Sequence, residues 1–205
     1  MFSISEIFRR RSHSGRTIRN SYLDNHGYYK SEEDRKPISR NGHSAPAIPY
    51  AVTDLLESKL NKEMSIFVRW DIYSYRWALH RGGHAASCCV KLKKKSSSGH
   101  RHFVRNSSVS AEELAAFSSD HQHSFDLMIF DGPDKHKEVP VILNMLAPRG
   151  IVIMTDDFSD PYDFDRALEQ FTQAGFKSFQ ITNPAPLFHE LTAAVLYRAE
   201  NFVGF

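Results

Sequence analysis

Short runs of apolar residues alternate with polar segments along the chain from residue 45 onward. Short, largely apolar runs of this kind are typical of strands that are buried in a sheet. Between the runs, apolar residues recur at helical spacing and predict intervening helices. Strands are expected at Met64–Val68, Ala85–Val90, Phe125–Phe130, Gly150–Thr155, Lys177–Ile181 and Ala193–Tyr197. Helices are expected at Tyr50–Leu60, Tyr73–His80, Ser110–Phe117, Lys135–Leu146 and Pro161–Ala174.

Several of these helices carry signals at their N-terminal ends. Ser110 and Glu113 form a capping box, in which each side chain satisfies the other residue's amide. Asp160 is a side-chain cap, and Pro161 after it suits the first helical position. Pro140 must lie in the first turn of its helix or kink it. These signals support a helix between successive strands.

The order of the elements predicts an α/β fold, with a Rossmann-like open sheet that is mostly parallel and ends in an antiparallel hairpin. Gly150–Thr155 is continuously apolar and is expected at the centre of the sheet. Sheets of this class bind ligands at the carboxyl ends of their strands, where the strand order reverses. The side chains expected at that edge are those of Asp71, Asp131, Asp156 and Asp157.

Composition limits the class of protein. The chain has 205 residues, of which 41% are hydrophobic, and this suffices for one core. No apolar run reaches the length of about 18 residues that a membrane span needs, so we expect no membrane partner. The adjacent Cys88 and Cys89 form no disulfide framework and suit a reducing compartment. No apolar stretch near the start resembles a secretory signal, and we expect a cytoplasmic protein.

The first 44 residues differ from the rest of the chain. They are rich in Ser, Arg, Asn and His, include three arginines at 9–11, and show little apolar periodicity. We expect a basic, flexible tail over residues 1–44 and one α/β domain over residues 45–205. Mitochondrial targeting and nucleic-acid binding are the alternatives for such a tail.

Charge is unevenly distributed, although the net charge is only +2. The sequence between Ile72 and Ala111 has no carboxylate, whereas acidic residues predominate in the C-terminal half. A basic block within that stretch contains Lys91, Lys93, Lys94, Lys95, Arg101 and Arg105. Such a block can bind an anionic partner through counterion release. The alternative is a solvated loop that the acidic half of the chain neutralises.

Two segments carry a resemblance to a known family. The first is FDLMIFDGPDKHKEVPVILNMLAPRGIVIMTDD at residues 125–157, in which Asp131-Gly132 ends one strand and Leu146–Gly150 leads into the next. The second is the closing LTAAVLYRAENFVGF at residues 191–205, and the helix IPYAVTDLLESKL at residues 48–60 fits the same pattern. From about Ser44 to Phe205 the chain resembles the class I S-adenosylmethionine-dependent methyltransferases.

The resemblance implies an enzyme that uses S-adenosylmethionine as methyl donor. The acceptor would be the hydroxyl of a small molecule or of a glycan. The resemblance places Asp131 near the methyl-transfer centre, with Lys135 as a base or as a contact to a substrate anion. It implies that Asp71, Ser74, Asp131 and Gly132 contact the cofactor.

A divalent cation is a further implication. Catechol-type O-methyltransferases hold one with carboxylates at the ends of comparable strands, and Mg²⁺ prefers oxygen ligands. Here Asp131 with Asp156 and Asp157 would hold it. The alternative is that these carboxylates cap helices, and that Lys135 is a solvated residue at a helix start. The histidines form no zinc-binding pattern.

Some positions depart from the family pattern. The family's first motif is acid-x-Gly-x-Gly, and its glycines let the backbone approach the cofactor closely. In this sequence the acidic position is Val68, and the glycines are replaced by Trp70 and Ile72. The family's acidic ribose ligand corresponds to about Cys89. Loss of these contacts predicts an alternative function, a catalytically inactive module of the same fold that binds an anionic partner.

Overall fold

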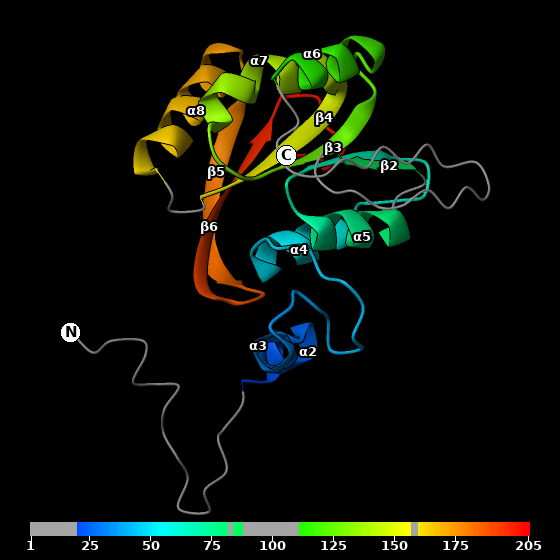
Figure 1. The fold of residues 1–205 in the computed structure, drawn as a ribbon, viewed down its shortest axis with the longest axis vertical. Coiled ribbons are helices and arrows are strands. Elements are labelled where there is room, and N and C mark those ends of the chain that lie inside the picture. Colours follow the sequence, from blue (N-terminus) through cyan, green and yellow to red (C-terminus); the bar gives the residue numbers. More distant parts are fainter. Residues whose placement is uncertain (1–19, 82–83, 88–110, 157–159) are drawn as a thin grey trace, which may run out of the picture.

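The computed structural model describes residues 20–81, 84–87, 111–156 and 160–205. These residues contain a six-stranded sheet with the strand order β2-β1-β3-β4-β6-β5 (Figure 1). The first four strands pair in parallel, and β6 pairs antiparallel with both β4 and β5. The strands are β1 Ser65–Arg69, β2 His84–Ser87, β3 Phe125–Phe130, β4 Leu146–Thr155, β5 Lys177–Ala185 and β6 Phe188–Tyr197. The predicted fold class, a mostly parallel Rossmann-like sheet with a C-terminal antiparallel hairpin, is confirmed.

The strand order reverses at β1. This strand lies between β2 and β3, so the chain that leaves β2 crosses to the other side of β1 before it forms β3. In open α/β sheets such a reversal leaves a crevice outside the carboxyl ends of the two diverging strands. The ends of β1 and β3 are therefore the place where this fold positions a ligand.

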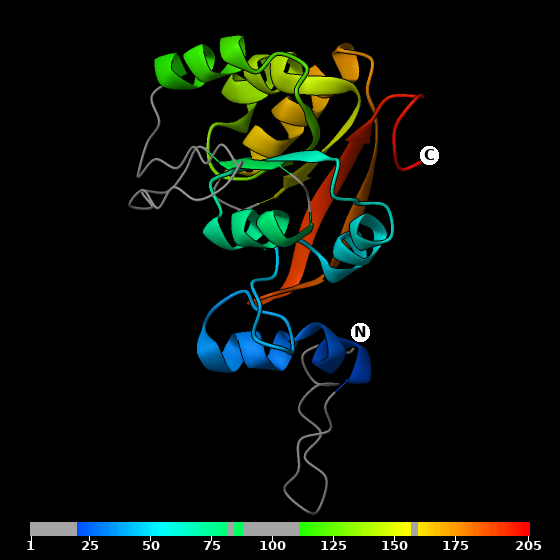
Figure 2. The same cartoon turned by 90° about the vertical axis from the view of Figure 1, so that its right-hand side faces the viewer.

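Helices cover both faces of the sheet (Figures 1 and 2). Helices α4 and α5 pack on one face, and α6, α7 and α8 pack on the other. Strand β3 shows why the chain folds this way, because Leu127 and Ile129 join the core beneath α4 and α5, whereas Met128 and Phe130 join the opposite core. Both faces of this interior strand are buried, which explains why every residue in it except Asp126 is apolar.

The helices agree well with the spacing of apolar residues. Asp160 caps α8 as predicted, because its carboxylate accepts a hydrogen bond of 2.9 Å from the amide of Tyr162. Pro140 lies inside α7, beyond its first turn, and Ser110 of the predicted capping box lies outside the described residues. Among the described helices, none is both long and apolar enough to cross a bilayer. Their bounds are α4 Tyr50–Glu57, α5 Ile72–Arg81, α6 Ala111–Asp120, α7 Lys135–Met145 and α8 Pro161–Gln173.

The C-terminal hairpin is longer than the sequence predicts. Residues 183–190 were expected to separate the two strands, but Asn183 pairs with Leu191 and Ala185 pairs with Phe188. The register shifts between Asn183 and Ala185, where Pro184 has no amide to donate to the ladder. Proline and asparagine are rare in strands, so the pattern ended the strands too early. The extension carries the hairpin tip toward the carboxyl edge of the sheet.

The N-terminal segment is more ordered than a flexible tail over residues 1–44. Residues 20–44 contain α2 Ser21–His26, α3 Tyr28–Asp34 and a bridge between Ile38 and Ser44, whereas residues 1–19 lie outside the described part. The hydroxyl of Tyr28 lies 2.6 Å from Nδ1 of His189 in the hairpin. This segment therefore packs against the sheet domain (Figure 2). The domain boundary at residue 44 remains a prediction.

Candidate functional site

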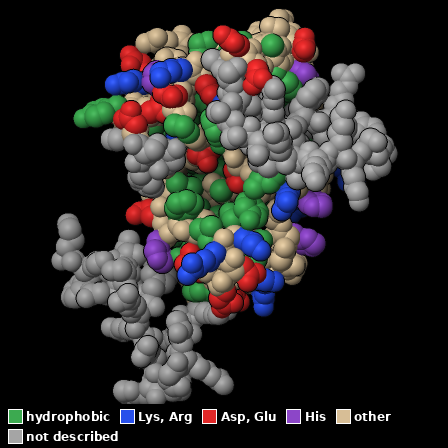
Figure 3. All heavy atoms as spheres, viewed as in Figure 1, with side chains coloured by type: hydrophobic (Ala, Val, Ile, Leu, Met, Phe, Trp, Pro, Cys, Tyr) green, Lys and Arg blue, Asp and Glu red, His purple; other side chains and the backbone are tan. Residues whose placement is uncertain are grey.

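A pocket of about 290 Å³ lies at the carboxyl ends of β1, β3 and β4, and we call it the edge pocket. It occupies the position that the strand reversal predicts for a ligand. Its walls combine acidic and apolar side chains. Figure 3 shows acidic and apolar side chains next to one another near the middle of the face that is turned to the viewer. The walls are formed by Ala47, Trp70, Asp71, Asp131, Thr155, Phe188 and Leu191.

Asp71 and Ser74, both predicted to contact a cofactor, have different placements. The Asp71 carboxylate lines the edge pocket and caps α5, accepting hydrogen bonds of 3.0 Å from the amide of Tyr73 and 2.6 Å from that of Ser74. The side chain of Ser74 is fully buried, and its Oγ accepts a hydrogen bond of 3.0 Å from the amide of Ala47. Ser74 therefore joins α5 to the segment before α4 and does not line the pocket.

Asp131 lies at the end of β3 and faces the same pocket. Its Oδ1 accepts a hydrogen bond of 2.7 Å from the amide of Gly132 and another of 2.7 Å from the hydroxyl of Thr155. Thr155 is the last residue of β4, so the two neighbouring strands hold this carboxylate between them. The carboxylates of Asp71 and Asp131 thus share one pocket, as the sequence predicts for strand ends.

Trp70 covers Gly132. A Cβ atom on Gly132 would lie 2.6 Å from Cγ and 2.7 Å from Nε1 of the Trp70 indole, so the ring is packed directly against the glycine. The backbone of Trp70 has a φ of 79°, a conformation that glycine adopts readily and a residue with a side chain rarely does. This geometry agrees with the alignment of Trp70 on a glycine of the family motif. A glycine at position 70 would leave the space above Gly132 open, and here the indole of Trp70 fills that space.

An ion pair behind the pocket holds Trp70 in place. The guanidinium of Arg69 lies 4.0 Å from the centre of the Trp70 ring. Arg69 is 1% exposed, and it donates two hydrogen bonds to the Glu138 carboxylate, from Nε at 2.9 Å and from Nη2 at 2.6 Å. Such a forked pair fixes the plane of the guanidinium, and with it the ring that stacks on it.

Lys135 is buried, so the alternative prediction of a solvated lysine at the helix start is wrong. Its side chain is 1% exposed, and its ammonium group donates a hydrogen bond to the carbonyl oxygen of Gly132. It does not line the edge pocket. This placement favours a positioning role for Lys135, as a tether of the loop after β3, over the proton transfer that the resemblance implies.

Asp163 is a buried acid of α8 that caps the neighbouring helix α7. Its carboxylate accepts hydrogen bonds from the amides of Lys135 at 2.8 Å and His136 at 3.0 Å, and it also contacts Nδ1 of His136. Burial by itself raises the pKa of Asp163, but the hydrogen bonds from His136 and Lys135 outweigh it and hold the pKa below its ordinary value of 3.8. Asp163 therefore stabilises the fold in its charged form.

Replacing Asp163 with Asn is expected to lower the free energy of unfolding by about 2 kcal/mol near pH 5, because the charged acceptor is lost. A depressed folded-state pKa adds stability above the unfolded value, and this stability disappears as the pH falls through the folded value. The difference between wild type and variant should thus shrink below pH 3.8. Urea unfolding at several pH values measures it, with the exposed Asp165→Asn on the same helix as control. A difference that stays constant with pH contradicts the prediction.

Asp156, another predicted site residue, does not line the edge pocket. Asp156 follows Thr155, and its amide donates a hydrogen bond of 2.9 Å to the carbonyl of Thr192. Asp157 lies outside the described residues, so the predicted cation site of Asp131, Asp156 and Asp157 remains a prediction. Within the described ranges, no group of three or more His, Cys, Asp or Glu side chains is arranged to hold a metal. Every residue of the basic block also lies outside them.

Sequence reasoning missed several walls of the edge pocket. Phe188 and Leu191 come from the extended hairpin, and Ala47 precedes α4. Thr155 offered a signal, because it is a hydroxyl residue that closes an apolar run. Nothing in the local pattern distinguishes the other three.

No protein-family model and no curated protein sequence matches the chain. Solved structures do match its fold. An O-methyltransferase from Bacillus cereus in complex with SAH is 9% identical, with a TM-score of 0.52 over 88% of this chain and 93% of that one. An rRNA methylase from Streptococcus thermophilus is 12% identical, with a TM-score of 0.50 over 74% of this chain and 96% of that one.

A spermidine synthase from Thermotoga maritima shares the fold as well. It is 13% identical, with a TM-score of 0.52 over 72% of this chain and 57% of that one. The common feature of these proteins and this chain is the open sheet with helices on both faces. The chain has the fold of the class I methyltransferases, and the resemblance seen in its sequence is confirmed at that level.

Proposed function

We propose that this protein is an S-adenosylmethionine-dependent methyltransferase that transfers a methyl group to the hydroxyl of a small molecule or glycan at the edge pocket. The observation that carries the proposal is the position of this pocket at the strand reversal, with Asp71 and Asp131 in its walls. The likeness to an O-methyltransferase that binds SAH supports the choice of donor.

The polar and apolar residues of the edge pocket would have different roles in binding a substrate. Asp131, fixed by Thr155 and by the amide of Gly132, is oriented to accept a hydrogen bond from an acceptor hydroxyl. Phe188 and Leu191 offer apolar surface from the hairpin, which excludes water from a bound substrate. Catalysis at such a site depends mainly on holding the reacting groups in line.

The donor does not fit the site in the family's usual manner. The indole of Trp70 fills the space above Gly132 that a nucleoside would approach, and the sequence between Ile72 and Ala111 offers no carboxylate for its ribose. Binding would require the indole to leave Gly132. We therefore expect Trp70 to limit the affinity of the protein for the donor.

Calorimetric titration of the full chain with S-adenosylhomocysteine tests the proposal. We expect measurable binding to wild type, and binding at least about tenfold tighter to Trp70→Gly, since the variant opens the space over Gly132 and relieves the unfavourable φ. Trp70→Phe keeps a ring at the same place and should bind like wild type. The absence of heat with both wild type and Trp70→Gly would refute the proposal.

The second candidate function is a catalytically inactive module that binds an anionic partner through the basic block. The packing of Trp70 on Gly132 favours this second function. A φ of 79° strains the backbone of a residue with a side chain, and the indole that this strain places on Gly132 occupies the space that a donor nucleoside would approach. The same titration separates the two. Binding of S-adenosylhomocysteine to Trp70→Gly but not to wild type supports the inactive module.

A further inference from the structure

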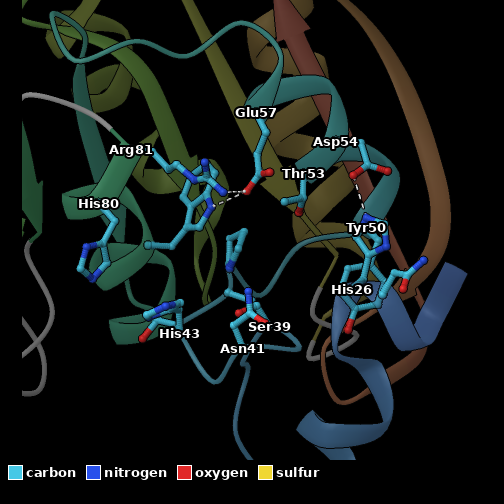
Figure 4. A pocket seen from close by; sticks show the side chains of 15 residues that line it. His26, Ser39, Asn41, His43, Tyr50, Thr53, Asp54, Glu57, His80 and Arg81 are labelled. Carbon is cyan, nitrogen blue, oxygen red and sulfur yellow. Dashed lines mark hydrogen bonds and ion pairs between the residues drawn. The ribbon is translucent and has the colours of Figure 1, made fainter.

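A second and larger pocket lies between the N-terminal segment and the sheet domain, and it shares no lining residue with the edge pocket. We call it the N-terminal pocket (Figure 4). Its volume is about 450 Å³, within the range of roughly 300–1,000 Å³ that small-molecule sites occupy. Loop residues 39–46, helix α2, one side of α4 and the C-terminal end of α5 form its walls. Its titratable side chains are those of His26, His43, Tyr50, Asp54, Glu57, His80 and Arg81.

Both carboxylates of the N-terminal pocket already have basic partners. Asp54 accepts contacts of 2.7 Å from His26 and 2.9 Å from the hydroxyl of Tyr22. Glu57 lies 2.6 Å from Arg81, and Figure 4 shows the two pairs at separate places, with both carboxylates on α4. A free cation or anion would have to compete with these pairs for its counter-charge. A ligand without net charge can therefore bind without displacing either pair.

The rim of the pocket carries exposed or half-buried side chains that can form hydrogen bonds with a ligand. The side chains of Ser39, Asn41, His43 and His80 line the pocket, and none of them has a hydrogen bond to another described residue. The rings of His43 and His80 lie 6.3 Å apart. Hydroxyl, amide and neutral imidazole groups can each both donate and accept a hydrogen bond. A ligand with many groups that both donate and accept hydrogen bonds is complementary to these side chains.

We propose that the N-terminal pocket binds a neutral, polyhydroxylated ligand, that is, an uncharged sugar. Sugar hydroxyls donate and accept hydrogen bonds, as Ser39, Asn41, His43 and His80 do, and they need no counter-charge. The paired Asp54 and Glu57 keep acceptor oxygens at the wall for further hydroxyls. The inference does not depend on methyl transfer or on the edge pocket.

Titration of the full chain with maltose and with cellobiose, followed by the imidazole NMR signals of His43 and His80, tests this inference. We expect saturable shifts of both signals with at least one of the two sugars. His43→Ala and Asn41→Ala should weaken that binding by at least about fivefold, because each removes hydrogen bonds made to the ligand. Lys62→Ala, an exposed residue outside the pocket, should leave it unchanged.

Charged probes complete the experiment. Inorganic phosphate and spermidine should cause no saturable shift of these signals, because neither presents the array of hydroxyl groups on which the proposed recognition rests. Saturation by phosphate or spermidine, or no saturation by either sugar up to its solubility, would overturn the inference. Unchanged backbone spectra of the alanine variants will show that they are folded.

Discussion

Replacing Glu138 with Ala is expected to lower the free energy of unfolding by about 3 kcal/mol, because it removes a carboxylate that accepts two hydrogen bonds from the buried guanidinium of Arg69. Arg69 is 1% exposed and Glu138 is 16% exposed, so little water can take the place of the lost partner. Two hydrogen bonds, from Nε and Nη2 of Arg69, would be lost together. Urea unfolding followed by circular dichroism measures the change.

A matched control exists in the same protein. Arg81 and Glu57 form an ion pair of the same chemistry and the same 2.6 Å separation, but their side chains are 48% and 35% exposed. Glu57→Ala removes this pair and a hydrogen bond of 3.3 Å from Nε1 of Trp77, and should still cost only about 1 kcal/mol, less than Glu138→Ala. Arg69→Met combined with Glu138→Leu should recover most of the loss, because neither charge is then buried. Equal losses in Glu138→Ala and Glu57→Ala would contradict the role given to burial.

The sequence was sufficient to predict the strands that lie in the middle of the sheet. The predicted bounds of β3, Phe125–Phe130, match the structure residue for residue. Such a strand is buried on both faces, so all its positions except Asp126 are apolar. Strand β4 is predicted less well, because it begins at Leu146, four residues before the predicted Gly150, and includes the exposed Pro148 and Arg149. The hairpin obeys a weaker constraint, because it is exposed toward its tip, and Asn183–Ala185 continues β5 through cross-strand pairing alone.

The N-terminal helices could not be predicted for a different reason. Helices α2 and α3 have six and seven residues, which is too short for an apolar period to show. They are stabilised by contacts to residues far away in the sequence, such as the hydrogen bond between Tyr22 and Asp54. A pattern confined to neighbouring positions contains no information on such partners.

The sequence predicted which carboxylates meet at the candidate site, but it did not predict the contacts that hold Lys135 and Trp70 beside the site. Asp71 and Asp131 share a pocket because parallel strands end at the same edge, which the topology alone requires. The burial of Lys135 depends on the carbonyl of Gly132, and so it could not be read from the helix start. The alignment identified Trp70 as an obstacle, and the structure adds that Arg69 and Glu138 hold it there.

Replacing Gly132 with Ala is expected to destabilise the protein by about 3 kcal/mol, for two separate reasons. Gly132 has a φ of 91°, which a residue with a Cβ atom adopts only under strain. The new Cβ would also lie 2.6 Å from Cγ of Trp70, so the indole or the backbone would have to move. The free energy of unfolding in urea measures the sum of the two effects.

A second glycine separates these two contributions. Gly175 has a φ of 84°, but a Cβ added to it would meet nothing within 4 Å. Gly175→Ala therefore introduces the backbone strain alone, and we expect a loss of only about 1 kcal/mol. The excess cost of Gly132→Ala over Gly175→Ala then estimates the contact with the indole.

A double-mutant cycle with Trp70→Ala assigns that excess to its cause. If the ring lies on Gly132, removing it should reduce the cost of Gly132→Ala to that of Gly175→Ala. An unchanged cost would mean that the indole already leaves Gly132 in solution. In that case Trp70 could not limit donor binding, and the tighter binding expected of Trp70→Gly should be absent as well. The stability cycle and the S-adenosylhomocysteine titration therefore test the same contact independently, one without any ligand and the other through it.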